Sequence, residues 1–371
     1  MQAAAPGKVI LTGEHSVVYG KPAVAMAIDA HVSARLVPAP QGHDWSVKLV
    51  GRKAWRFTAA ELPALILDID QRFDRFLAND LSIRSVLPSP EALLIYSLAQ
   101  GARESSKTPL ASLTALFERL PPHTLTTHST IHAGGGMGSS AAAIAAAVRL
   151  GEALAEQTLS VEERMERVGY CERLQHGRGS KIDASAVSFG GKVVLQNGIP
   201  TPQSLPNLSQ GWYLVNTGRA KVSTGECVSY VREHHGSSDI WAEFESVSQG
   251  FLTDLAKAQL PLARIKENHR LLQRLGVVPK QVARFIELVE LNGGAAKVSG
   301  SGAHKGQNAG LVLVCQPDMG VLQRLCKRFG YKVWPLKEDP HGARLLSHEY
   351  LWHDQGICPR QLNVNGRTCR A

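Results

Sequence analysis

A glycine-rich stretch at residues 131–148, IHAGGGMGSSAAAIAAAV, holds the residues whose types and spacing most clearly indicate chemistry. Glycines and serines precede an alanine run here: Gly134, Gly135, Gly136, Gly138, Ser139 and Ser140. Because each glycine costs folding entropy, so many of them indicate that something approaches this backbone closely. A strand before the loop and a helix after it would aim backbone N–H groups at an anion such as a phosphate.

This glycine loop matches neither of two well-known phosphate-binding patterns. A Walker A loop requires a lysine where Ser139 stands, and the G-x-G-x-x-G spacing is absent. From these residues alone, a tight turn with close helix packing is an alternative to nucleotide binding.

The hydrophobic pattern predicts the elements that would hold the loop. Residues 124–133 alternate apolar and polar side chains like a strand, and a helix is predicted from Ser139 onward. A second helix over 160–177 begins with a serine and has glutamates in its first turn. Other strands are expected at 8–12, 23–28, 31–60 (a hairpin), 212–216, 295–299, 309–316 and 331–336, and other helices at 91–105, within 236–292 and at 318–330.

These strands and helices interleave without a regular βαβ period, which favours an α+β architecture over a doubly wound parallel sheet. A length of 371 residues exceeds the usual limit for one hydrophobic core, so two domains are expected. Residues 196–211 are rich in Pro, Gly, Ser and Asn and form the predicted boundary. We expect domains at 1–195 and 212–345, followed by a tail, 346–371, whose low core-forming content is compatible with disorder.

Charge and cysteine content narrow the classes of partner. The net charge of +9 is compatible with an anionic substrate, or with a basic surface that serves solubility. The basic residues of the chain are dispersed, which argues against a nucleic-acid partner. No apolar stretch approaches the roughly 18 to 20 residues of a membrane span, and no signal peptide is evident, so a cytoplasmic protein is expected. The six cysteines form no CxxC pair, which predicts reduced structural thiols and no structural zinc.

Two further stretches flank the glycine loop: APGKVILTGEHSVVYGKPAVAMAI at 5–28 and KVSGSGAHKGQNAGLVLV at 297–314. Together the three stretches resemble the three motifs of the GHMP family of small-molecule kinases, named for galactokinase, homoserine kinase, mevalonate kinase and phosphomevalonate kinase. The first stretch is similar to the mevalonate kinase branch and lacks the Thr-Asp-Tyr that follows Gly-Glu-His in galactokinases. Similar blocks at 171–191 and 267–278 extend the resemblance over most of the chain.

The resemblance implies a two-domain α+β GHMP kinase fold with the active site in the cleft between the domains. It implies that ATP is bound by Gly134, Gly135, Gly136, Met137, Gly138, Ser139, Ser140 and Ser301. It further implies that Mg²⁺ is held by Ser140 and Glu172, and that Asp183 is the general base with Lys8 beside it. The acceptor would contact Glu14, His15 and Asp183. Without the resemblance, Glu172 would be a solvated helix residue, Asp183 a helix cap and His15 a bystander in a turn.

The chain departs from the family pattern at three places. His132 and Ala133 stand where the second motif usually opens with proline, and Met137 replaces a leucine of similar volume. The segment 303–305, Ala-His-Lys, interrupts the glycine run of the third motif, and its His304 and Lys305 would either supply charge to phosphates or be solvated. Lys181 replaces a small residue and would either meet an anionic acceptor or tune Asp183.

The resemblance therefore predicts an ATP- and Mg²⁺-dependent kinase that phosphorylates the primary hydroxyl of mevalonate in isoprenoid precursor synthesis. One alternative is a related kinase with another acceptor, chiefly phosphomevalonate, whose phosphate would need extra cations. Another is a non-catalytic metabolite-binding relative, which would usually lack Lys8, Asp183 or the second motif. The implied partners are small molecules, and a homodimer is suggested by analogy with the family alone.

Overall fold

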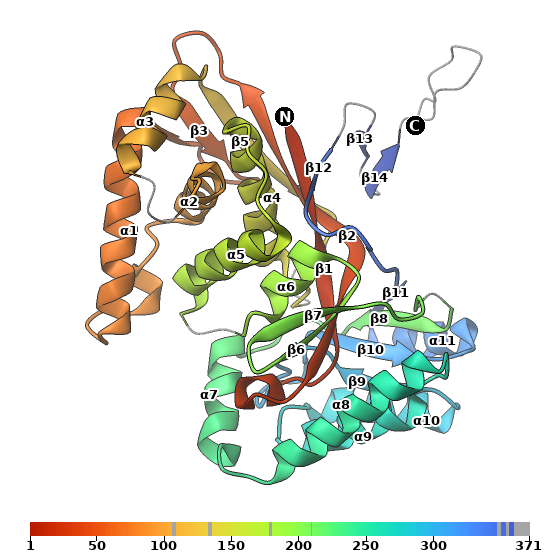
Figure 1. The fold of residues 1–371 in the computed structure, drawn as a ribbon. Coiled ribbons are helices and arrows are strands. Elements are labelled where there is room, and N and C mark those ends of the chain that lie inside the picture. The colour runs from red at the N-terminus through yellow and green to blue at the C-terminus, as the bar shows by residue number, and fades with distance from the viewer. Residues whose placement is uncertain are drawn as a thin grey trace, which may run out of the picture.

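Two larger β-sheets lie one above the other in Figure 1, and helices cover each of them. The computed structural model describes residues 1–105, 109–132, 136–177, 180–208 and 210–346, and the backbone of two short strands, β13 (Tyr350–His353) and β14 (Gly356–Pro359). Within these residues, no helix combines the length and the apolar character that a transmembrane span requires. Of the predicted tail, 346–371, the structure therefore describes only the side chain of residue 346.

The first sheet is built around a long antiparallel pair, β1 (Gln2–Thr12) and β2 (Ala23–Pro38). The free edge of β2 pairs with two strands in succession, β6 along its first half and β5 along its second. The other strands of this sheet are β3 (Trp45–Lys48), β4 (Trp55–Phe57), β5 (His123–Ser129), β6 (Lys192–Gln196), β7 (Ile199–Gln203) and β12 (Arg344–Leu345). Because β1 and β2 run from the upper sheet down beside the lower one, they connect the two halves of the molecule (Figure 1).

The second sheet is antiparallel throughout, in the order β11-β8-β10-β9. Alternate residues of its central strand β10 face opposite sides: Leu311 and Leu313 join the large core shared with the first sheet, whereas Val312 and Val314 join a core formed with the lower helices. Both faces are therefore buried, which explains the continuous apolar run in this strand. The strands are β8 (Trp212–Asn216), β9 (Ala295–Val298), β10 (Leu311–Cys315) and β11 (Lys332–Pro335).

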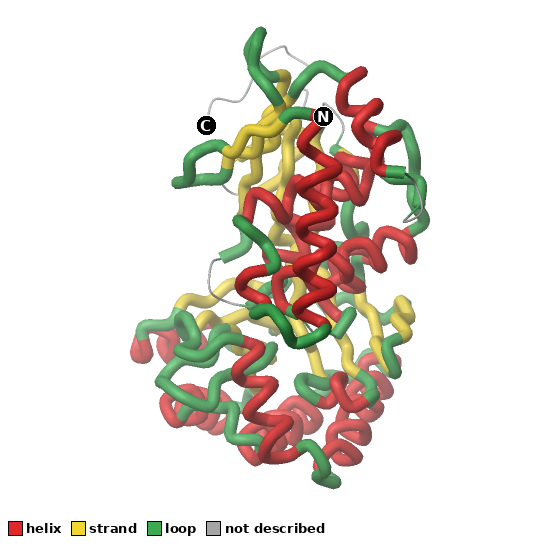
Figure 2. Tube along the Cα trace, turned by 90° about the vertical axis from the view of Figure 1, so that its left-hand side faces the viewer, coloured by secondary structure: helices red, strands yellow, loops and turns green. Residues whose placement is uncertain are grey.

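Helices cover one face of the first sheet in the upper half and lie around the second sheet in the lower half (Figure 2). The upper helices are α1 (Leu62–Leu77), α2 (Pro90–Ala102), α3 (Leu110–Arg119), α4 (Ser139–Leu154), α5 (Val161–His176) and α6 (Ile182–Phe189). The lower ones are α7 (Thr224–His235), α8 (Ile240–Ala256), α9 (Leu262–Arg274), α10 (Lys280–Leu291) and α11 (Met319–Phe329). Short 3-10 turns are η1 (Ser16–Tyr19), η2 (Ala59–Glu61) and η3 (Ile83–Ser85).

Helices α2 and α4 cross at unusually close range through two glycines. A Cβ on Gly101 would lie 2.0 Å from the Val148 carbonyl oxygen, and one on Gly151 would lie 2.0 Å from the Leu98 carbonyl oxygen. Only hydrogen fits at either position, because atoms of the opposing backbone cannot move away cheaply. This crossing fixes α4, the helix that begins at the glycine loop.

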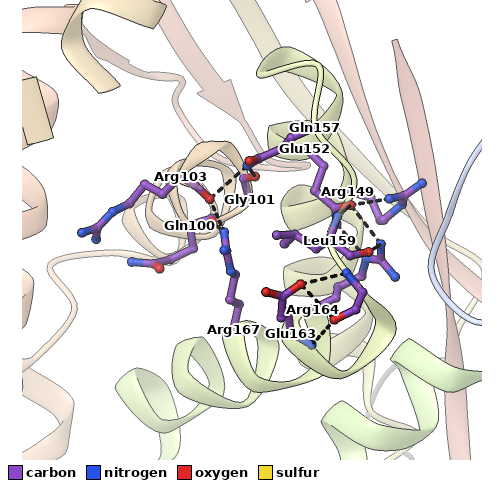
Figure 3. Close-up of polar contacts among 11 residues, drawn as sticks. Gln100, Gly101, Arg103, Arg149, Glu152, Gln157, Leu159, Glu163, Arg164 and Arg167 are labelled. Atoms are coloured by element: carbon purple, nitrogen blue, oxygen red, sulfur yellow. Dashed lines mark hydrogen bonds and ion pairs between the residues drawn. The ribbon is translucent and has the colours of Figure 1, made fainter. Parts of the chain in front are cut away.

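A buried carboxylate holds the far end of α4 (Figure 3). Glu152 is fully buried and accepts hydrogen bonds from Arg164 Nε at 2.7 Å and Nη2 at 2.9 Å, and from the Leu159 backbone N–H at 3.1 Å. Arg149 forms a further ion pair with it. Arg164 comes from α5, which starts after Ser160 as predicted, and the structure adds a capping box between Ser160 and Glu163. The network therefore joins α4 to α5.

The first part of the stretch 196–211 is a β-hairpin rather than the irregular linker that its composition predicts. Strand β7 pairs with β6 through a two-residue turn, Asn197-Gly198, in which both residues have positive φ. Pro200 and Pro202 lie two residues apart, so their missing N–H groups face the same side of the strand. Proline is tolerated there because β7 pairs only with β6 among the described strands, leaving its other edge unpaired.

After β11 the chain returns to the first sheet, where β12 pairs with β1. A buried cluster anchors this segment: His31 of β2 donates a hydrogen bond from Nε2 to the Asp339 carboxylate, and Arg344 Nη1 donates to the same carboxylate at 2.8 Å. Burial alone would raise the pKa of Asp339, but hydrogen bonds from His31 and the His341 N–H and the charge of Arg344 outweigh it and lower the pKa to about 2. The predicted domain limits at 195, 212 and 345 stay a prediction.

We expect Asp339→Asn to lower the free energy of unfolding by about 2 kcal/mol at pH 7. The pKa of Asp339 is lower in the folded state than its ordinary value of 3.8, so its stabilisation is present above about pH 4 and is lost as the pH falls toward 2. Urea unfolding of both proteins at pH 7 and pH 3 should show the difference shrinking at the lower pH. An equal difference at both values would contradict the assignment.

Candidate functional site

Lys8 and Asp183 form the central ion pair of the candidate site, with Lys8 Nζ 3.0 Å from Asp183 Oδ1. Lys8 is buried in the middle of β1, whereas the Asp183 side chain is 28% exposed and can therefore be reached by a ligand. Asp183 lies in the first turn of α6, which begins at Ile182, and the N-cap residue is Lys181. Asp183 is thus not the helix cap, so its carboxylate is free for the pair with Lys8.

The end of the glycine loop lies directly against this ion pair. Gly138 precedes α4 with φ of 69°, and a Cβ there would lie 2.9 Å from Lys8 Cγ and 3.7 Å from Asp183 Oδ2. The Lys8 backbone N–H donates to the carbonyl of the buried Met137 at 2.9 Å. Gly136 is exposed, also with positive φ, and Gly134 and Gly135 lie outside the described residues. Close contact with the Lys8–Asp183 ion pair therefore explains part of the glycine-rich stretch at 131–148.

Glu172 of α5 adds a second carboxylate next to the pair. Burial raises the pKa of this carboxyl to about 8, the negative charge of Asp183 acts in the same direction, and Lys8 opposes both. Glu172 forms no hydrogen bond or ion pair with another described residue. The carboxylates of Asp183 and Glu172 thus share one ammonium group, which leaves excess negative charge. A divalent cation that prefers oxygen ligands would neutralise this charge.

The two serines at the start of α4 differ in their surroundings. Ser139 is exposed, whereas Ser140 is half-buried and donates to Gln175 Oε1 at 2.6 Å. Gln175 lies three residues after Glu172 on α5, so both side chains belong to one helix face. Gln175 was not among the predicted site residues, although its spacing from Glu172 could have identified it. The Ser140 oxygen retains lone pairs that could bind a cation.

Glu14 and His15 follow β1 and turn toward the second sheet. Glu14 forms a buried ion pair with Lys297 of β9, and the His15 ring donates from Nε2 to the Ser301 carbonyl at 2.9 Å. Burial lowers the pKa of His15 to about 4, so the ring is neutral at pH 7. The Ser301 hydroxyl faces Thr224 at 3.5 Å. Contact of Glu14 and His15 with an acceptor stays a prediction.

The structure distinguishes among the unusual basic residues. The His304 ring stacks on Tyr230 with centroids 4.3 Å apart, so it packs on the protein, whereas Lys305 is exposed. Lys181 Nζ lies 2.5 Å from Glu166 Oε1 on α5, and this exposed pair occupies the lysine. His132 stacks on Trp334 of β11 at 3.9 Å. Of the basic residues that depart from the family pattern, only Lys305 extends into solvent without an assigned contact.

Sequence reasoning also missed Lys297, the counter-charge of Glu14. A lysine inside the otherwise apolar strand at 295–299 was the available signal, because a buried lysine needs a partner. Two surface hollows, one between Arg52 and Glu91 and the other between α9 and α10, are lined by none of the described candidate residues. Four described cysteines, Cys171, Cys227, Cys315 and Cys326, are buried and unbridged, as expected.

Comparison with known proteins agrees with the motifs. Residues 107–191 match the model of the GHMP kinases N terminal domain. The mevalonate kinase of Pyrococcus horikoshii is 29% identical over 314 residues, which cover 81% of this chain and 85% of that protein.

Solved structures with the same fold include kinases for two acceptors. The Methanococcus jannaschii mevalonate kinase is 19% identical with a TM-score of 0.69, over 94% of this chain and 98% of that one. A Streptococcus pneumoniae phosphomevalonate kinase, solved with phosphomevalonate and AMPPNP, is 14% identical with a TM-score of 0.66, over 91% and 99%. At such identities the structures establish the fold alone.

Proposed function

Because the chain belongs to the GHMP kinase family, we propose that it transfers the γ-phosphoryl group of ATP to the primary hydroxyl of mevalonate. The similarity to mevalonate kinases extends over four-fifths of the chain and supports this acceptor. The observation that carries the proposal is the Lys8–Asp183 ion pair against Gly138, at the start of the loop-to-helix junction.

In the proposed reaction, Asp183 accepts the proton of the acceptor hydroxyl as the new oxygen–phosphorus bond forms. A carboxylate is a weak base for an alcohol, so proton transfer must accompany bond formation rather than precede it. Lys8 holds the Asp183 carboxylate through the ion pair and places positive charge where the transferred phosphoryl group would lie. The glycine loop and Ser139 would bind phosphate oxygens through N–H and hydroxyl groups at the N-terminus of α4.

We assign the cation site of this reaction to Ser140 and Glu172. The two carboxylates around one ammonium group support a cation here, and the hydroxyl and carboxylate oxygens are the donor types that Mg²⁺ prefers. Bound Mg²⁺ supplies charge neutralisation for the phosphates of ATP. Gln175 orients the Ser140 hydroxyl through its hydrogen bond, so the oxygen lone pairs point away from that contact.

A panel of acceptors tests the proposal. ADP release is measured with mevalonate, phosphomevalonate, galactose and homoserine, and the proposal expects the highest kcat/KM for mevalonate. Lys181 forms an exposed pair with Glu166, a contact of about 0 to 1 kcal/mol that a phosphorylated acceptor could displace, so the panel decides between the two acceptors. Turnover of phosphomevalonate or another acceptor without turnover of mevalonate would overturn the proposal. We further propose a cytoplasmic enzyme that binds its substrates in a cleft between two domains.

Gly138→Ala is expected to lower kcat by roughly tenfold or more while the protein stays folded. The added methyl group would collide with Lys8 Cγ and displace its ammonium group from Asp183. Backbone strain at positive φ adds a stability loss of about 1 to 2 kcal/mol. Gly330→Ala is the matched control, because Gly330 has φ of 71° but nothing within 4 Å of the new methyl group. Equal kcat losses in both variants would contradict the assignment.

A further inference from the structure

Lys297 is a fully buried lysine that the proposed reaction does not use. It belongs to β9 of the second sheet, and its exposed fraction is 0%, beside 1% for its partner Glu14. Its Nζ also donates to the Ile10 carbonyl of β1 at 3.3 Å. Removing two charged groups from water is costly, and an apolar pair of similar volume is often as stable. A role beyond stability is therefore worth seeking for this pair.

The backbone next to Lys297 is attached to the strand that carries Lys8. Ser299, the first residue after β9, accepts a hydrogen bond from the Ile10 N–H and donates one to the Ile10 carbonyl, both at 3.0 Å. Ile10 lies two residues after Lys8, so both side chains face the same side of β1, toward α6. The Lys297 ammonium group thus contacts the backbone of β1 at Ile10, two residues after Lys8.

Lys8 lies in the field of three carboxylates, those of Asp183, Glu172 and Glu14. It contacts Asp183 at 3.0 Å, and its charge also acts on Glu14. Burial raises the pKa of Glu14, and the charges of Lys297 and, to a smaller extent, Lys8 act in the opposite direction. Glu14 Oε2 has no hydrogen-bond partner among the described residues, so this carboxylate could accept another cation.

We infer that Lys297 is a positioning residue: it neutralises Glu14, and the ammonium group of Lys8 thereby stays paired with Asp183. Without Lys297, the buried Glu14 carboxylate would attract the neighbouring Lys8, and Asp183 would lose its counter-charge. The effect on turnover rests on the proposed function, whereas the effect on the position of Lys8 does not.

The first arm of the test is kinetic. Lys297→Met keeps an unbranched side chain up to the Cε position and removes the ammonium group, and it is expected to lower kcat by roughly tenfold or more, with KM for ATP changed less than about twofold. The double variant Glu14→Gln/Lys297→Met removes both charges, and its readout is the position of Lys8 rather than kcat, because Glu14 is itself a predicted acceptor contact. All values are taken at a temperature where thermal melts show every variant to be folded.

The second arm is spectroscopic and needs no acceptor. The NMR resonance of the Lys8 Cε, in lysine labelled with ¹³C and assigned by its loss in Lys8→Arg, should move in Lys297→Met and return in the double variant. Lys192→Met is the control, because Lys192 is also buried but is paired with Glu338, which is not a candidate-site residue. This control should lower the melting temperature without moving the Lys8 resonance.

The outcomes separate the two proposals. An unmoved Lys8 resonance with unchanged kcat in folded Lys297→Met would overturn the inference and leave Lys297 a structural residue. If Lys297→Met does not fold, the double variant is measured in its place. The inference expects the Lys8 resonance of the double variant at the wild-type position, and a displaced resonance would overturn the inference. If the wild type phosphorylates no acceptor, the proposed function fails, but the spectroscopic arm still decides the role of Lys297.

Discussion

Asp183→Asn is expected to lower kcat by about 10²- to 10⁴-fold, the usual contribution of a positioned general base. The amide has nearly the same shape as the carboxylate but cannot accept the proton of the acceptor hydroxyl. It also removes the negative charge that holds Lys8 at 3.0 Å, so the ammonium group is no longer fixed. Steady-state rates of ADP release at saturating ATP and mevalonate measure the effect, and KM for ATP should change little because Asp183 lies on the acceptor side of the proposed reaction.

A control must show that the loss is not a general effect of removing a carboxylate from a helix N-terminus. Asp183 lies in the first turn of α6, where a negative charge stabilises the helix by about 0.3 to 1 kcal/mol. Glu162 occupies the first turn of α5 and is exposed. Glu162→Gln should therefore alter stability by a similar small amount and leave kcat unchanged. Near-full turnover of Asp183→Asn would rule out the proposed chemistry.

Glu152→Ala is expected to produce the largest loss of stability, about 3 to 5 kcal/mol. Two arginines, Arg149 and Arg164, would lose the carboxylate that neutralises them, and Arg164 is buried in the folded protein. The Leu159 N–H would also lose its acceptor in a buried position. Urea unfolding followed by circular dichroism measures the change, and the variant should begin to lose the α4–α5 contact seen in Figure 3.

An exposed ion pair supplies the comparison for this stability prediction. Glu166→Ala removes the partner of Lys181, a pair whose side chains are 56% and 43% exposed, and such pairs contribute about 0 to 1 kcal/mol. Each variant loses one glutamate, Glu152 from α4 or Glu166 from α5. The difference between their losses of unfolding free energy therefore measures the effect of burial. A loss below 1 kcal/mol for Glu152→Ala would mean that water reaches the two arginines.

Features with a local physical cause could be predicted from the residues alone. Strand β8 follows the predicted range 212–216, and α4 begins at the predicted Ser139, because hydrophobic period and the end of the glycine run are local signals. The cap of α5 at Ser160 depends only on residues three positions apart. The strand β7 was missed because Pro200 and Pro202 indicate a linker, and only the pairing with β6 shows that they lie on an unpaired edge.

The residues alone identify which side chains could do chemistry and show that their order is similar to that of the GHMP motifs. Charge pairing was decided only by the tertiary structure: that Lys8 contacts Asp183, that Lys181 is occupied by Glu166, and that Glu14 faces Lys297 of the other sheet. Hydrophobic periodicity and helix or strand propensity depend on residues that are close in the sequence. A buried charge, in contrast, is compensated by whichever opposite charge the fold brings within a few ångströms, however far away it lies in the sequence.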